Sequence, residues 1–295
     1  MSMMTFFSSV DGEFVSSGTR AEHLLEDRGL AYGHGLFETM ALHQTQLPLL
    51  QQHLQRLVTD ARKLGIDLSF EAVETCVNAF IAALVAEDVE NAVVKVILTA
   101  GAGGRGYQTP AELQPHIVCI SSPLPVDLEH RRRNGINLWC CQYQLPLNSQ
   151  LAGIKHLNRL DQIFARNECD SVGYEDGVMF AADGSLIETT SANIFIKTAT
   201  GWVTPALDSA GVNGVMRTLL LQEIFPAMEL PVCSRSITAD ELWCCNESFI
   251  CNAIRGIVPV LSITDSCRQT KLNLALGVET KRLQSRLDND YVGFK

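Results

Sequence analysis

The chain has 295 residues, of which 46% are hydrophobic and 19% charged, with 23 basic against 33 acidic side chains. This length allows one large or two ordinary domains, and the composition is that of a globular protein and not of a disordered one. The net charge of −10 disfavours binding to nucleic acid, and because no apolar run or leader pattern suits a membrane or export, we expect a cytoplasmic protein without a membrane anchor.

Ten cysteines lie mostly inside apolar stretches, and no two of them form a C-x-x-C pair. A zinc site normally shows paired ligands at short spacing, whereas His116 and Cys119 are a single pair. We therefore expect no metal site and interpret the cysteines as reduced, mainly buried thiols.

The first part of the chain predicts two strands, two helices and two further strands. Asp11-Gly12 suits the positive φ angles of a hairpin turn, Ser69 suits a helix N-cap, and β-branched residues dominate the last two runs. The predicted elements are a hairpin over 6–15, helices over 47–66 and 69–88, and neighbouring strands over 91–100 and 116–122.

Pro123 and Pro125 mark a joint between two parts of the chain. We predict a small domain over 1–122 and a larger one over 123–295, and we expect the run Arg131–Arg133 on a solvated surface. Strands mostly follow strands in the second part, with helices outside them, so the predicted fold class is α+β and not a repeating βαβ scheme. The predicted elements are strands at 135–145, in pieces over 176–206 and within 243–254, helices at 156–170, 214–225 and 272–287, and an irregular stretch at 262–272.

The loop Gly101–Gly106 reads GAGGRG and matches the dinucleotide-binding pattern G-x-G-x-x-G. That pattern needs a helix whose N-terminus receives the pyrophosphate, but here Tyr107–Pro110 leads into a loop and another strand. We therefore interpret the segment as a flexible loop. No G-x-S-x-G occurs, so a hydrolase with a serine nucleophile is unsupported.

Lys155 lies in the stretch LAGIKHLNRLDQ, between a predicted strand and a predicted helix, with aliphatic neighbours such as Ile154 and Leu157. Desolvation disfavours the ammonium form of a lysine and leaves a free amine that can attack a carbonyl. A side chain that reaches out to water from an apolar stem fits the same window. The window alone leaves both interpretations open.

Three further features would complete a site for a phosphorylated aldehyde cofactor. Glu188 can keep a pyridine nitrogen protonated, so that the ring becomes an electron sink. A helix predicted after Gly214 offers its first amides, at Val215 and Met216, to a phosphate, and Arg56 offers a permanent charge. Taken singly, these features also fit a surface acid, an ordinary helix start and an exposed helix charge.

The order of these features resembles the fold-type IV pyridoxal-phosphate enzymes, a family that includes D-amino-acid and branched-chain aminotransferases and aminodeoxychorismate lyases. The resemblance covers nearly the whole chain. Within the family, LAGIKHLNRLDQ, GGRGY and AGVNGVMR are most similar to the lyases. The matching segments are RGLAYGHGLFETM (28–40), HLQRL (53–57), GIKHLNRL (153–160), ETTSANIF (188–195), GVNGVMR (211–217) and ICNAIRGIVPV (250–260).

The resemblance implies that Lys155 both holds pyridoxal 5'-phosphate and acts as the catalytic base. The implied reaction is elimination from 4-amino-4-deoxychorismate, which yields pyruvate and 4-aminobenzoate, a folate precursor. It also implies a two-domain fold of the D-amino-acid aminotransferase type and a homodimer in which the partner chain completes the site. The implied cofactor-binding residues are Lys155, Arg56, Glu188, Val215, Met216 and Asn252.

A substrate with two carboxylates needs fixed donors, and the candidates are Arg105, Tyr107 and Arg255, with Thr39 of the FET motif. Lyases of the family often have an arginine on the strand before the lysine, where this chain has Gln142–Gln144, so the way the carboxylates are held stays open. Two other functions stay open as well: an aminotransferase for D-amino or branched-chain acids, and a catalytically silent binding protein of the same fold.

Overall fold

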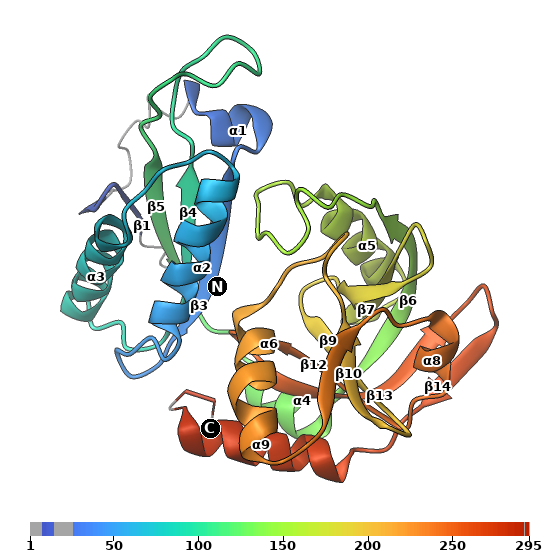
Figure 1. Cartoon of the computed structure of the whole chain (residues 1–295). Coiled ribbons are helices and arrows are strands. Elements are labelled where there is room, and N and C mark those ends of the chain that lie inside the picture. The colour runs from blue at the N-terminus through green and yellow to red at the C-terminus, as the bar shows by residue number, and fades with distance from the viewer. Residues whose placement is uncertain (1–7, 15–25, 292, 295) are drawn as a thin grey trace. The chain divides into compact units, whose positions relative to one another are not determined.

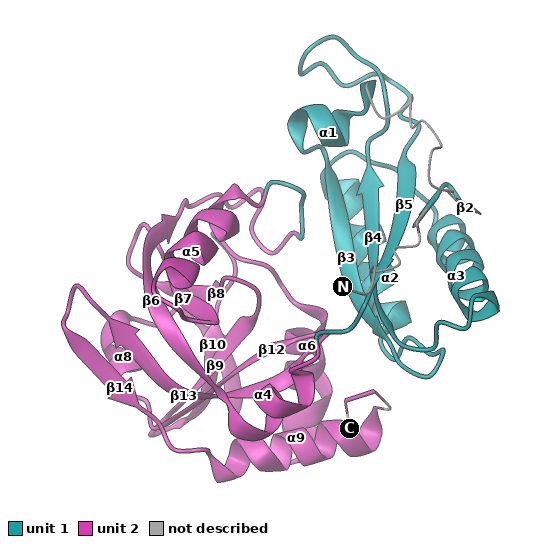
Figure 2. Cartoon of the chain, turned by 180° about the vertical axis from the view of Figure 1, so that it is seen from behind, with its two compact units in different colours: residues 1–125, 155–158 teal, residues 126–154, 159–295 magenta. Residues whose placement is uncertain are grey.

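The structure is a computed structural model that describes residues 8–14, 26–291 and 293–294. The chain divides into two compact units: unit 1 is Met1–Pro125 with Lys155–Asn158, and unit 2 is Val126–Ile154 with Arg159–Lys295 (Figures 1 and 2). This division falls three residues after the boundary predicted at residue 122. The segment Lys155–Asn158 goes with unit 1, whereas the sequence places it in the larger domain, because its backbone pairs with a strand of unit 1.

Unit 1 is built on a five-stranded antiparallel sheet in the order β2-β1-β5-β4-β3. Helix α2 packs along β3, and α3 packs along β5 and against α2 (Figure 1). Alternate residues of β4 are buried, so one face of the sheet joins the apolar sides of the helices in a common core. The elements are β1 (Ser8–Val10), β2 (Glu13–Phe14), α1 (Arg28–Tyr32), β3 (Gly35–Leu42), α2 (Leu50–Lys63), α3 (Phe70–Ala86), β4 (Ala92–Thr99) and β5 (His116–Ser122).

The local predictions for unit 1 are confirmed where the residues are described. Asp11 and Gly12 form the hairpin turn with φ angles of 50° and 87°, while residues 6, 7 and 15 of the predicted hairpin lie outside the described part. Ser69 caps α3 by accepting the backbone N–H of Ala72 at 3.1 Å. Helix α1 and strand β3 were missed, because glycines interrupt the apolar periodicity between residues 29 and 35.

Unit 2 contains a nine-stranded mixed sheet with the path β11-β10-β9-β12-β13-β6-β7-β8, and β14 pairs with β13. Strand β6 runs parallel to both β13 and β7, and β10 runs parallel to β11. With helices set outside the sheet, the α+β class is confirmed (Figure 2). The elements are α4 (Leu128–Asn134), β6 (Ile136–Leu145), α5 (Leu160–Ser171), β7 (Asp176–Ala181), β8 (Leu186–Thr189), β9 (Asn193–Thr198), β10 (Gly201–Pro205), α6 (Val215–Leu219), η2 (Leu220–Ile224), α7 (Phe225–Ala227), β11 (Val232–Arg235), α8 (Ala239–Trp243), β12 (Glu247–Asn252), β13 (Gly256–Asp265), β14 (Thr270–Asn273) and α9 (Val278–Asp290).

An aromatic stack fills part of the core of unit 2. Phe195 and Phe249 stack with ring centroids 4.8 Å apart, and Trp202 lies 5.0 Å from Phe249. The buried Trp202 donates its indole N–H to Glu279 of α9 at 2.7 Å, so its polar atom is satisfied. Helix α9 packs on β12 and β13, which closes this side of the core.

Four local predictions for unit 2 are wrong. Helix α5 begins at Leu160 and not at residue 156, because His156 forms an isolated bridge with Leu36 of β3. Helix α9 begins at Val278 and not at residue 272, because Thr270–Asn273 form β14. The stretch predicted to be irregular, 262–272, is a hairpin formed by the end of β13 and β14. Arg131 and Arg132 are only 16% and 14% exposed and form ion pairs, so only Arg133 of the run is on the solvated surface that was expected.

Within residues 8–14, 26–291 and 293–294, no helix is both long enough and apolar enough to span a membrane. The same residues contain no cluster of histidine, cysteine and acidic side chains arranged to hold a metal ion. All ten cysteines are free thiols. Cys141 and Cys169 come nearest to pairing, with their buried Sγ atoms 3.7 Å apart.

Replacing the cap of α3, Ser69→Ala, should lower the free energy of unfolding by about 1 kcal/mol, because one N–H of the first turn loses its acceptor. The measurement is denaturant unfolding followed by circular dichroism. The matched control is Ser285→Ala, an exposed serine inside α9, where the change should stay within about 0.5 kcal/mol. An equal effect at both serines would contradict the capping role.

Candidate active site

The backbone around Lys155 is held by β3. Phe37 donates its N–H to the carbonyl of Lys155, and Leu157 donates to the carbonyl of Gly35, both at 3.0 Å. The Lys155 side chain is half-buried, with its Nζ 4.1 Å from the centroid of the Phe37 ring. Of the two interpretations of this lysine, the structure supports an amine held against an apolar aromatic face and not one that extends into solvent.

The chain just before Lys155 is held by a different segment. Gly153 donates its N–H to Gly211 and accepts from Asn213, both at 2.9 Å, so it pairs with Val212 as in a parallel ladder. Val212 in turn donates its N–H to Glu188 Oε2 at 2.9 Å.

Glu188 is a buried carboxylate at the end of β8, with 4% of its surface exposed. Its Oε1 accepts from the Gln162 side-chain amide at 3.2 Å. Arg159, which the sequence analysis did not select, lies close enough for its charge to interact with Glu188; burial lowers the pKa of this arginine, and the Glu188 charge opposes that shift. The carboxylate that was predicted to face a ring nitrogen is thus held in place from two sides.

Arg56 projects from α2 and is fixed by a carboxylate that the sequence analysis did not assign. Its Nε and Nη2 bind the two oxygens of Glu38 on β3, at 2.7 and 2.5 Å. His53, one turn earlier on α2, donates its Nδ1 to Glu38 Oε2 at 2.6 Å. The exposed fractions are 1% for Glu38, 2% for His53 and 13% for Arg56, so the charges are paired in a largely dry environment.

The electrostatics of this triad, Glu38, His53 and Arg56, favour an ionised glutamate. Burial alone would raise the pKa of Glu38, but the charges of Arg56 and His53 and their hydrogen bonds outweigh it and lower the pKa to about 2. Burial lowers the pKa of His53, and although Glu38 opposes this shift, the charges of Arg56 and Lys155 add to it. His53 is therefore neutral at pH 7, and its buried Nε2 has no hydrogen-bond partner among the described residues.

Helix α6 begins at Val215, as predicted, after the N-cap Gly214. Gly214 donates its own N–H to Asn193 Oδ1 at 3.2 Å, and a Cβ at this position would lie 2.2 Å from that oxygen. Arg217, buried in the same helix, donates to Asn213 Oδ1 at 2.8 Å and so holds the loop before the helix. The backbone of residues 211–214 is therefore placed by side chains that reach it from the sheet and from the helix.

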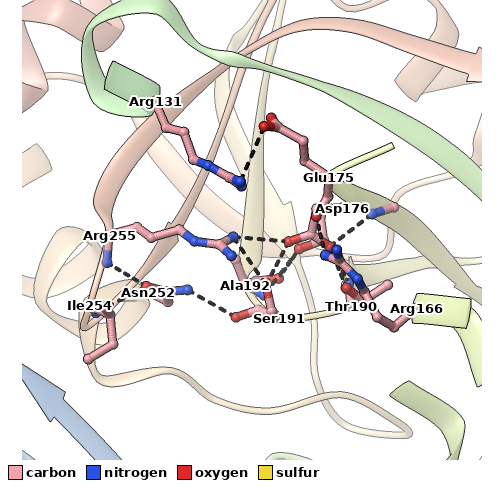
Figure 3. Close-up of polar contacts among 12 residues, drawn as sticks. Arg131, Arg166, Glu175, Asp176, Thr190, Ser191, Ala192, Asn252, Ile254 and Arg255 are labelled. Atoms are coloured by element: carbon pink, nitrogen blue, oxygen red, sulfur yellow. Dashed lines mark hydrogen bonds and ion pairs between the residues drawn. The ribbon is translucent and has the colours of Figure 1, made fainter. Parts of the chain in front are cut away.

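Asn252 and Arg255 belong to the turn between β12 and β13 (Figure 3). Asn252 accepts the N–H groups of Ile254 and Arg255 and donates to the carbonyl of Ser191, so its side chain closes the turn. Arg255 Nη1 lies 3.3 Å from Asp176 Oδ2 and from Ser191 Oγ. A direct contact of Asn252 with the cofactor, and of Arg255 with the substrate, stays a prediction.

Asp176 organises the turn that follows Glu188, and the sequence analysis did not select it. It is fully buried, and one carboxylate oxygen accepts the N–H groups of Gly177 and Thr190 and the Thr190 hydroxyl. The other oxygen accepts the Ser191 hydroxyl and faces Arg255 (Figure 3). A charged residue that opens an otherwise apolar strand, as in EDGVMF, is the sequence signal that identifies such a buried acid.

Three of the four candidate substrate residues, Thr39, Arg105 and Tyr107, lie in unit 1. Thr39 shares a partly buried face of β3 with Phe37, and Lys95 of β4 lies directly opposite Thr39. Arg105 and Tyr107 lie in the glycine loop with exposed side chains, and Tyr107 is 87% exposed. The cofactor candidates Lys155 and Arg56 are also in unit 1, whereas the remaining predicted site residues, Glu188, Val215, Met216, Asn252 and Arg255, belong to unit 2.

Comparisons with known proteins identify the family of the chain. The family model described as "Amino-transferase class IV" matches residues 35–263, which span Arg56, Lys155, Glu188 and Asn252. The chain belongs to the class IV aminotransferase family. Within this family, an aminodeoxychorismate lyase of Vibrio harveyi is 32% identical over 277 residues, covering 93% of this chain and 99% of the relative.

Solved structures and a second relative complete the comparison. The crystal structure of 4-amino-4-deoxychorismate lyase from Pseudomonas aeruginosa superposes with a TM-score of 0.86 and 35% identity, covering 97% of this chain and 99% of that chain. A D-alanine aminotransferase of Bacillus licheniformis is 27% identical over 266 residues, covering 90% of each chain. The Escherichia coli branched-chain amino acid aminotransferase shares the fold, with a TM-score of 0.81 at 18% identity over 98% and 95% of the two chains.

Removing the charge of Glu38 should destabilise the protein, because the guanidinium of Arg56 would lose the carboxylate that two of its nitrogens bind. We expect Glu38→Gln to lower the free energy of unfolding at pH 7 by about 3 kcal/mol, as is typical when one member of a buried ion pair is lost. Glu129→Gln, which breaks an exposed ion pair with Arg133, is the control and should cost less than about 1 kcal/mol. Denaturant midpoints and slopes give both values; equal losses would refute the importance of the triad.

Acidification should also destabilise the protein. The pKa of Glu38 is lowered from 4.5 to about 2, so its contribution is complete above pH 4.5 and is lost as the pH falls towards 2. The pKa of His53 lies below 6.5, so the folded state resists a proton that the unfolded state accepts, and stability also falls as the pH drops below 6.5. In Glu38→Gln the loss between pH 4.5 and 2 should be smaller than in the wild type. Unfolding curves measured across this range check both statements.

Proposed function

We propose that this chain is a pyridoxal-phosphate-dependent lyase that converts 4-amino-4-deoxychorismate into 4-aminobenzoate and pyruvate. The observation that carries the proposal is a half-buried lysine, held against an aromatic ring, in a chain that is similar over nearly its whole length to an aminodeoxychorismate lyase. Similarity to the Pseudomonas aeruginosa lyase structure supports it, at 35% identity over 97% of this chain. The D-alanine aminotransferase relative is less similar, at 27% identity.

The residues present fit the cofactor. Glu188 is a buried carboxylate that can face a protonated ring nitrogen, and the amides of Val215 and Met216 begin a helix, where a phosphate is favoured. Gly211, whose backbone lies near Glu188, leaves no room for a side chain. A Cβ on this glycine would lie 2.6 Å from Ile187 Cγ2. A buried acceptor, Gln162 Oε1, has no partner among the described residues in this region.

The residues proposed to hold the cofactor differ in charge and therefore in role. Lys155 would hold the cofactor covalently, Glu188 would keep its ring nitrogen protonated, and Arg56 and the amides of Val215 and Met216 would offer donors to the phosphate. Asn252 shapes the turn between β12 and β13. When bound, pyridoxal 5'-phosphate supplies an aldehyde for the lysine and a pyridinium ring that takes up electrons when a proton leaves the substrate.

The chemical work of the chain itself lies with Lys155. Its free amine removes the proton from the substrate carbon that bears nitrogen, and loss of the neighbouring enolpyruvyl ether then gives pyruvate and the aromatic ring. A base fixed at both ends of its segment gains on the order of 7 kcal/mol over a free one by positioning alone. The neutral His53 and the paired Glu38 and Arg56 maintain a fixed charge pattern near this amine.

The second candidate, an aminotransferase for D-amino or branched-chain acids, has a specific observation in its favour. Gln142, Tyr143 and Gln144 on β6 stand where lyases of the family often have an arginine, and Tyr143 donates its hydroxyl to Asp161. A substrate carboxylate is therefore not bound by an arginine of β6.

For the proposed lyase reaction, we assign recognition of the substrate carboxylates to Arg105, Tyr107 and Arg255 instead, with Thr39 beside the substrate.

We also propose that the protein is a homodimer in the cytoplasm. Leu160, Ile163 and Phe164 lie on one face of α5 and are 67%, 51% and 55% exposed. Three large apolar side chains at this spacing form a surface that suits a protein partner, and a second copy of the chain agrees with the family resemblance.

The test supplies 4-amino-4-deoxychorismate to the purified, cofactor-loaded protein and measures 4-aminobenzoate and pyruvate. Lys155→Ala should abolish product formation and the visible absorbance of lysine-bound cofactor. The matched control is Lys95→Ala, because Lys95 Nζ also lies 4.8 Å from the Phe37 ring but on β4, and this variant should keep its activity. Rapid transamination of an amino acid with 2-oxoglutarate, with no pyruvate from aminodeoxychorismate, would replace the lyase by the aminotransferase.

A further inference from the structure

The glycine loop of unit 1 is held from inside by Arg28. This arginine is 4% exposed, and its guanidinium contacts four carbonyls of the loop: Nη1 lies 3.1–3.3 Å from those of Gly103, Gly106 and Gln108, and Nη2 lies 3.3 Å from that of Tyr107. Among the described residues no carboxylate forms an ion pair with it. The partial negative charges of the loop carbonyls therefore take the place of a counterion.

The position of Arg28 is itself fixed. Its backbone N–H bonds to the carbonyl of Gly101 at 2.9 Å, and its Nε bonds to His34 Nδ1 at 3.2 Å. Asp27 caps α1 by accepting the N–H of Gly29 at 2.7 Å, and it also accepts the Thr99 hydroxyl at 2.5 Å. The guanidinium is thus a fixed point around which the loop folds, and not a flexible surface charge.

The conformation of the loop explains its glycines. Gly103, Gly104 and Gly106 have φ angles of 112°, 79° and 60°, a backbone conformation that favours glycine, and the carbonyls of Gly103 and Gly106 face Arg28. A Cβ on Gly104 would lie 2.1 Å from the carbonyl oxygen of Gln108 and 3.0 Å from Arg28 Nη1. Only glycine fits there, so the GAGGRG pattern serves to wrap a guanidinium and not to bind a dinucleotide.

With the carbonyls turned inward, the side chains of the loop turn outward. Tyr107 is 87% exposed, and Arg105 is exposed beside it. On one side Tyr107 packs edge-on against Tyr32, with ring centroids 5.4 Å apart, and Tyr32 also lies 5.2 Å from the Arg28 guanidinium. These contacts fix the direction of the Tyr107 ring, and the backbone bonds to Arg28 on either side of Arg105 fix the point from which its guanidinium extends.

We propose that Arg28 is a positioning residue: its guanidinium fixes the backbone of residues 103–108 so that Arg105 and Tyr107 meet the substrate carboxylates in one preset arrangement. The inference rests on the proposed function. Ordering a free loop costs conformational entropy, and a loop already ordered by Arg28 does not incur this cost when substrate binds. Arg28 does not contact the substrate, so it acts only through the loop.

The first arm of the experiment measures substrate kinetics of the holoenzyme. Arg28→Met, which keeps the stem but removes the donors, should raise KM for 4-amino-4-deoxychorismate about tenfold or more and change kcat by less than about threefold, because the loop contacts serve ground state and transition state alike. Arg62→Met, an exposed arginine in the last turn of α2, is the control and should match the wild type. Where Arg28→Met does not fold, Arg28→Lys serves, because an ammonium cannot reach four carbonyls at once.

The second arm distinguishes positioning from general stability by a double-mutant cycle. In an Arg105→Ala, Tyr107→Ala background, Arg28→Met should have little further effect on KM, because the side chains it positions are gone. An undiminished effect in that background, or a fall in kcat with KM unchanged, would overturn the proposal.

The third arm needs no substrate and so separates this inference from the proposed function. Trypsin should cleave after Arg105 about tenfold faster in Arg28→Met than in the wild type, because an unanchored loop opens more often. Fragment masses identify the site of cleavage. A wild type that forms no 4-aminobenzoate would refute the proposed function alone, whereas an unchanged rate of cleavage would refute the anchoring by Arg28.

Discussion

The site depends on one constraint: the short chain between β6 and α5 is hydrogen-bonded twice, to two different segments. Gly153 pairs with Val212, and two residues later Lys155 and Leu157 pair with β3. A lysine between two such pairings cannot move its backbone without breaking one of them. The amine therefore has only its own side-chain torsions to adjust, which suits the role proposed for it as cofactor anchor and base.

Three arginines with little exposed surface are stabilised in different ways, and each way has its own structural effect. Arg56 has a full carboxylate partner in Glu38, which fixes its direction and leaves the triad with little net charge. Arg217 is satisfied by an amide oxygen, a hydroxyl and a carbonyl, and it joins a helix start to its preceding loop. Arg28 donates hydrogen bonds to loop carbonyls and to a histidine, so its charge orders a loop without neutralising the side chains that the loop presents.

Acidic residues have the complementary role. Asp176 uses both oxygens to gather the turn after Glu188 and the guanidinium of Arg255, and Glu188 itself is held by an amide and a backbone N–H (Figure 3). Each buried charge is matched by several donors, because an unmatched carboxylate in a dry core would be costly. A network of this kind gives the cofactor residues a fixed frame before anything binds.

The sequence by itself determined the elements whose signals are local, the order of the site motifs and the family. Neighbouring residues alone predict the turn at Asp11-Gly12, the helix cap at Ser69 and the strands β4 and β5. The structure confirms all of them. Only the tertiary structure decided that α5 starts at Leu160, that Arg131 and Arg132 form ion pairs and are only partly exposed, and that Glu38 pairs with Arg56, Asp176 with Arg255 and Arg28 with the loop carbonyls. The partners of Glu38, Asp176 and Arg28 lie far away in the sequence. Neither the periodicity of the sequence nor the spacing of its motifs shows which charges, carbonyls and strand edges come together when the chain folds.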